Sequence, residues 1–79
     1  MVTIIDMSHH PRVKLPNETI AEGTMNAREF LIDLCETYAV DPAILLEKLV
    51  ILVDGERLKQ DTLVHDNSKI YILPAATMG

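Results

Sequence analysis

Few side chains in this sequence could do chemistry, and none falls into a nucleophile–base arrangement. The single cysteine, Cys35, lies among apolar residues at helical spacing, which favours a buried, inert thiol over a reactive one. His9 and His10 are adjacent in a turn-like segment with no third ligand nearby, which favours a solvated turn over a metal site. His65, beside Asp66, is more typical of a surface residue than of a general base. We therefore expect no internal catalytic centre and no metal.

The other group that could react is the carboxylate of Gly79. A residue without Cβ lets the backbone approach another protein's active site closely, and unanchored chain ends are commonly mobile. Because glycine is a common residue, a glycine at the end of the sequence is weak evidence for a function. Its place shortly after Pro74 is the stronger evidence. We expect residues 1–74 to form one domain and residues 75–79 to form a flexible tail.

Length and charge exclude several classes of function. With 79 residues the chain holds one domain at most. Its net charge of −5, with scattered basic residues, argues against a nucleic-acid partner and favours a basic protein surface. No apolar stretch reaches the roughly 20 residues that span a bilayer. The N-terminus lacks a basic segment followed by an apolar run, so we expect no signal peptide and a cytoplasmic protein.

One long helix is the clearest local element. Asn26 is a good N-cap, Glu29 follows three residues later as in a capping box, and Met25 and Phe30 occupy hydrophobic-staple positions. The apolar spacing that follows predicts an amphipathic helix over residues 27–39. A second, short helix is expected after Asp41, with proline at its first position.

Strands are predicted on both sides of this helix, with Pro16 interrupting the second of them and the Asp54–Gly55 turn following the third. The order is strand, strand, helix, strand, short strand, strand. This order indicates an α+β fold: a mixed sheet of about four to five strands with one main helix across one face. The predicted strands are residues 2–7, 12–20, 49–53, 56–58 and 69–73.

The predicted sheet has more apolar surface than one helix can cover. Side chains alternate between faces along a strand, yet residues 49–53 and 70–73 are apolar at every position. The second face is therefore either covered by the short helix and loops or left exposed as a surface for a partner. The sequence leaves both alternatives open.

Three stretches, in order, carry a resemblance to a known family. They are residues 21–24 (AEGT), 49–56 (LVILVDGE) and 61–74 (DTLVHDNSKIYILP), and a terminal glycine follows shortly after. Together they resemble the sulfur-carrier branch of the ubiquitin-like β-grasp superfamily: the small subunit of molybdopterin synthase and the thiamine-pathway sulfur carrier. Asn67 stands where these families usually have glycine, and Met78 replaces the first glycine of their terminal Gly-Gly.

The resemblance implies a β-grasp fold and a carrier function rather than an enzyme. A separate ubiquitin-activating-like enzyme would use ATP to adenylate Gly79, and a sulfur donor would convert the adenylate to a thiocarboxylate. The sulfur would then serve cofactor biosynthesis, with molybdopterin and the large subunit of its synthase as the implied pathway and partner. The alternatives are an interaction module without sulfur chemistry and a modifier joined to lysines. The resemblance implies that the activating enzyme contacts Leu73, Pro74, Ala75, Ala76, Thr77 and Met78.

Overall fold

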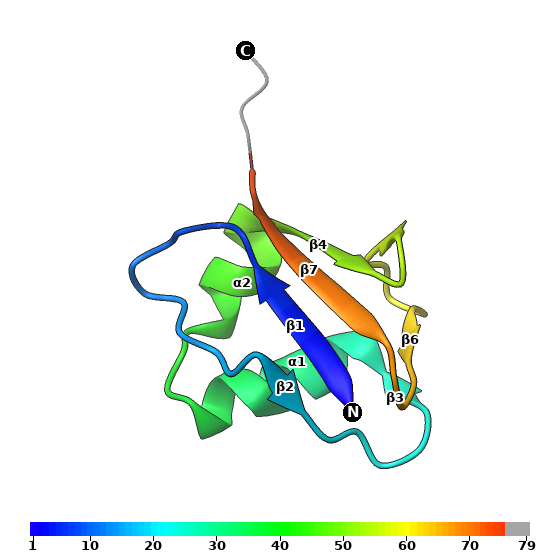
Figure 1. Ribbon diagram of the computed structural model, residues 1–79. Helices are drawn as coiled ribbons and strands as arrows, with labels where there is room; N and C mark the ends of the chain where they lie inside the picture. Colours follow the sequence, from blue (N-terminus) through cyan, green and yellow to red (C-terminus); the bar gives the residue numbers. More distant parts are fainter. Residues whose placement is uncertain (76–79) are drawn as a thin grey trace.

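A five-stranded mixed sheet forms the body of the protein in the computed structural model, which describes residues 1–75 (Figure 1). The strand order is β2-β1-β7-β4-β5. The central pair, β1 and β7, is parallel, and every other neighbouring pair is antiparallel. The expected α+β class with a mixed sheet is confirmed. The strands are β1 (Val2–Asp6), β2 (Glu18–Thr19), β4 (Leu49–Val53), β5 (Glu56–Arg57) and β7 (Lys69–Pro74).

Two helices lie on one side of this sheet (Figure 1): α1 (Ala27–Thr37) and α2 (Pro42–Lys48). The N-cap prediction for α1 is confirmed, because the Asn26 side chain accepts a hydrogen bond of 3.1 Å from the Glu29 N–H. The helix ends two residues before its predicted limit. Ala39 adopts a left-handed φ of 57°, which stops α-helical backbone. In α2, Asp41 caps and Pro42 opens the helix, as expected.

The core lies between the helices and the sheet face that they cover. Alternate residues of the three central strands are buried there, and α1 contributes Phe30, Leu31, Leu34 and Cys35 from its apolar side. Since a fully buried leucine stabilises a fold by about 2–3 kcal/mol relative to exposure, this layer is the main source of stability. The buried strand residues are Val2, Ile4, Ile51, Val53, Ile70 and Ile72.

The second strand was predicted over residues 12–20, and most of that prediction is wrong. Only Glu18–Thr19 pairs, with Val2 and Thr3 of β1. The preceding residues turn instead, with the Val13 N–H donating to the His10 C=O at 3.1 Å. Pro16 cannot donate to a ladder, so the segment joins the sheet only after it.

Two short strands were not predicted. β3 (Met25–Asn26) and β6 (Leu63–Val64) form a separate two-stranded antiparallel sheet. Each has only two residues, which is too short for an alternation pattern to be recognised in a sequence. This small sheet holds the N-terminus of α1, where the Ala27 N–H donates to the Thr62 C=O at 2.8 Å.

Candidate functional site

The C-terminal end of β7 is the part of the structure closest in sequence to the predicted reactive group. β7 is hydrogen-bonded to β1 on one side and β4 on the other. Near its end, the Ile72 C=O accepts a bond of 2.7 Å from the Met7 N–H, and Pro74 lies opposite Leu49. Pro74 has no N–H and closes the ladder. β7 is therefore held by both neighbours as far as Ile72 and by β4 as far as Pro74.

The predicted site residues divide into two groups. Leu73 is half-buried on the sheet, while Pro74 and Ala75 are exposed. Residues 76–79 lie outside the described residues, so the predicted contacts of Ala76, Thr77 and Met78 and the tail around Gly79 remain predictions.

The sheet face opposite the helices carries a second set of apolar side chains. Ile5, Tyr71 and Leu52 lie side by side across β1, β7 and β4, because each is directly paired with the next. Val50 and Leu73 form a second pair beside this row. All five are half-buried rather than buried. Both helices lie on the other side (Figure 1), so within residues 1–75 neither helix covers this face.

At the end of the sheet where β7 begins, a buried serine joins the β4–β5 turn to the loop before β7. Ser68 is 3% exposed, and its hydroxyl donates to Asp54 Oδ2 at 2.7 Å while accepting from the His65 N–H at 2.9 Å. Asp54 Oδ1 accepts from the Lys69 N–H at 2.9 Å. The pKa of Asp54 is lowered, first by the Ser68 hydrogen bond and then by the Lys69 N–H. This role of Ser68 was not predicted from the sequence, since serine in a turn-rich segment is normally solvated.

Turn geometry explains why these residues meet. Asp54 and Gly55 have φ values of 51° and 88°, which belong to a tight hairpin turn between antiparallel strands. Asn67 has a φ of 75°, so the left-handed backbone that glycine would provide is adopted here by asparagine. The structure thus accommodates asparagine at a position where the families that the sequence resembles usually have glycine.

Cys35 is fully buried on α1, and burial raises the pKa of its thiol, with a smaller contribution from the charge of Asp41. The expectation of a core thiol is confirmed. A protonated and inaccessible thiol is a poor nucleophile.

The histidines occupy loops. His10 Nδ1 accepts from the Arg12 N–H at 3.1 Å, and His65 Nδ1 lies 3.1 Å from the Thr24 hydroxyl. Within the described part of the chain, no group of three histidine, cysteine, aspartate or glutamate side chains could hold a metal ion. Neither described helix is long and apolar enough to cross a membrane.

Comparisons with known proteins add no assignment. No family model matches the chain. No curated protein matches it either. The proposal that follows therefore rests on the sequence motifs and on the geometry described above.

Proposed function

We propose that this protein is a β-grasp sulfur carrier whose working group is the carboxylate of Gly79. The observation that carries the proposal is the position of β7: a central strand, held by both neighbours, ends at Pro74 and continues in sequence into residues 75–79. The strand order, with a parallel central pair and both described helices on one face, supports the β-grasp fold. The motifs at residues 49–56 and 61–74 support the carrier family.

The chemistry would take place on a separate adenylating enzyme. A carboxylate oxygen of Gly79 attacks the α-phosphorus of ATP, and pyrophosphate leaves. Hydrosulfide from a sulfur donor then attacks the acyl carbon and displaces AMP, which leaves a thiocarboxylate. The thiocarboxylate sulfur then attacks an acceptor in cofactor biosynthesis and displaces a leaving group from it, with molybdopterin as the proposed product. Water hydrolyses the resulting acyl–sulfur bond, which leaves the sulfur on the acceptor and restores the carboxylate of Gly79. In this scheme the chain is a substrate and subunit acting in the cytoplasm, with no bound cofactor.

The face formed by Ile5, Val50, Leu52, Tyr71 and Leu73 has a natural place in the scheme. An activating enzyme must hold the carrier while it handles the tail, and half-exposed apolar side chains next to the start of the tail provide contact area. This face adjoins Pro74 through the Val50–Leu73 pair, so a partner covering it would lie beside the tail.

Pyrophosphate exchange tests the proposal. An adenylating enzyme of the family incorporates labelled pyrophosphate into ATP only when it has a carboxylate substrate. We expect exchange with the full chain and none with a chain lacking Gly79, while Asp33→Asn, an exposed change on α1, retains it. Equal exchange with and without Gly79 would refute the proposal.

A second candidate function is an interaction module that uses the same apolar face without sulfur chemistry. The half-exposed row Ile5–Tyr71–Leu52 favours it. Under this alternative, Tyr71→Lys abolishes partner binding, whereas removal of Gly79 has no effect on it. Under the carrier proposal, both changes impair activation.

A further inference from the structure

An open groove lies between β2 and α1, and its volume is about 390 Å³. One wall is a single side of α1, where four residues follow one another at intervals of three and four: Phe30, Asp33, Leu34 and Thr37. These residues span about two helical turns, or roughly 10 Å, which is the length of about three residues of extended chain. The other wall comes from β2 and the segment that follows it: Thr19, Ile20, Glu22 and Met25.

The groove presents apolar surface that the described residues leave uncovered. Ile20 is 70% exposed, the largest value among the exposed large hydrophobic residues in the described part of the chain. Met25 is half-buried, and the largely buried Phe30 and Leu34 complete a lining that is mostly apolar. An exposed aliphatic side chain beside such a groove is typical of a binding surface.

β2 is an edge strand with unpaired backbone groups. Within residues 1–75 its one neighbour in the sheet is β1. The Ile4 N–H donates to the Asn17 C=O at 2.7 Å, and Thr19 lies opposite Val2. Because backbone groups alternate in direction along an antiparallel strand, the N–H and C=O of Glu18 point away from β1. No described residue bonds to them, so this edge is free to pair with an extended segment.

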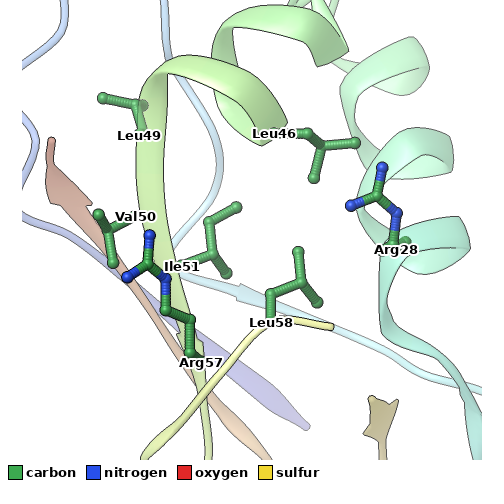
Figure 2. A pocket seen from close by; sticks show the side chains of 7 residues that line it. All are labelled: Arg28, Leu46, Leu49, Val50, Ile51, Arg57 and Leu58. Carbon is green, nitrogen blue, oxygen red and sulfur yellow. The ribbon is translucent and has the colours of Figure 1, made fainter. Parts of the chain in front are cut away.

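The charge of the groove indicates which kind of segment fits it. No basic residue lines it, while three exposed carboxylates lie in its walls or on the adjoining edge: Glu18, Glu22 and Asp33. Among residues 1–75 none of the three forms an ion pair. The smaller hollow beside β4 has the opposite character, since Arg28 and Arg57 both line it (Figure 2). The segment that complements the groove between β2 and α1 is therefore cationic.

We propose that the groove between β2 and α1 binds an extended segment of a partner protein in which lysine or arginine residues flank apolar ones. The segment adds a strand along Glu18 and places apolar side chains against Ile20 and Leu34. Its basic residues reach the carboxylates of Glu22 and Asp33. Main-chain hydrogen bonds provide affinity and the groove provides specificity, as in other cases of strand addition.

This binding would be independent of the sulfur chemistry. Thr19 lies opposite Val2, a core residue on the helix side of the sheet, so the groove also lies on that side. The apolar sheet face assigned above to the activating enzyme lies on the opposite side. Both surfaces can therefore be occupied at once.

A titration with short blocked peptides, followed by amide NMR shifts and hydrogen exchange, tests the proposal. The probe has three valines between two pairs of lysines, and the matched peptide has glutamates in place of the lysines. We expect only the lysine peptide to bind and to shift the amides of Ile20, Met25 and Asp33. We also expect exchange of the Glu18 N–H to slow in the bound state, which distinguishes an added strand from side chains that only fill the groove.

Substitutions separate the apolar and the charged contributions. Ile20→Ser should weaken binding about tenfold, because the contact of an exposed aliphatic side chain is lost. Glu22→Gln and Asp33→Asn should each weaken it about two- to fivefold, the effect of losing an exposed charge pair. The matched controls Met7→Ser and Glu36→Gln change exposed residues outside the groove and should leave binding unaltered.

Four results would overturn the proposal. Equal binding of the two peptides would remove the role of charge, and unchanged exchange of the Glu18 N–H in the bound state would exclude strand addition. Shifts centred on Ile5 and Tyr71 would place the site on the other face of the sheet. Shifts of the groove amides that depend on protein concentration without peptide would assign the groove to a second copy of the chain.

Discussion

Ser68→Ala removes the buried hydroxyl that links the β4–β5 turn to the start of β7. Two hydrogen bonds are lost: one to the Asp54 carboxylate at 2.7 Å and one from the His65 N–H at 2.9 Å. A bond to a charged group contributes about 1.5–3 kcal/mol, and an ordinary one about 1 kcal/mol. Asp54 is exposed, so water screens part of the first contribution. We expect a loss of about 2 kcal/mol in the free energy of unfolding at neutral pH.

Urea denaturation measures this loss. With a slope near 1 kcal/mol/M for so small a protein, the midpoint should fall by about 2 M. Thr37→Ala is the matched control, because its hydroxyl donates to the Asp33 C=O at 3.0 Å on the exposed side of α1. That change should stay within about 0.5 kcal/mol. Equal effects of the two substitutions would refute the structural role assigned to Ser68.

The penalty of Ser68→Ala should depend on pH. The pKa of Asp54 is lowered in the folded state from its usual 3.8, so ionised Asp54 stabilises the fold above that value. This contribution disappears as pH falls through the lowered pKa. The difference between wild type and Ser68→Ala should therefore be full near pH 6 and shrink below about pH 3.8. A difference that stays constant into that acidic range would contradict the link between Ser68 and the Asp54 carboxylate.

Three further predictions concern the helix cap, the thiol and the tail. Asn26→Ala should destabilise the protein by about 1 kcal/mol, because the cap to the Glu29 N–H is lost, and thermal unfolding should occur about 4–8 °C lower. Cys35, buried and with a raised pKa, should react with a thiol reagent only at the rate of global unfolding; rapid labelling under native conditions would show that it is accessible. Met78→Gly should increase the rate of pyrophosphate exchange if the activating enzyme's channel favours a penultimate glycine, and an unchanged rate would show that the side chain fits.

Much of the fold could be predicted from residues that cap helices or form tight turns. The cap at Asn26, the proline after Asp41 and the Asp54–Gly55 turn each fix backbone within a few residues, and all three are present in the structure. The prediction of a strand over residues 12–20 was wrong for all but Glu18–Thr19. Pro16 was expected to make this strand an edge or interrupted one, and β2 does lie at the edge of the sheet. Whether a segment pairs depends on its neighbour, and only Glu18–Thr19 reaches β1.

The candidate sites were less predictable because they depend on tertiary packing. Residues 49–53 and 70–73 are apolar at every position, and side chains alternate between the two faces of a sheet, so both faces were expected to be apolar. Only the packing of both helices on one side shows which face stays half-exposed. Ser68 gives no periodic signal, since it is buried by residues distant in sequence. Arg28 and Arg57 belong to elements that no motif connects, and only the packing of α1 and β5 beside β4 makes both of them line one small hollow.

Intact mass spectrometry of the chain after reaction tests the central claim most directly. The protein would be incubated with ATP, a family adenylating enzyme and a sulfur donor, and fragmentation would locate any change. The sulfur-carrier account predicts a mass increase equal to the replacement of one oxygen by sulfur, confined to the carboxyl group of Gly79 and dependent on ATP. An unchanged mass with an active enzyme, or sulfur found only on Cys35, would contradict it.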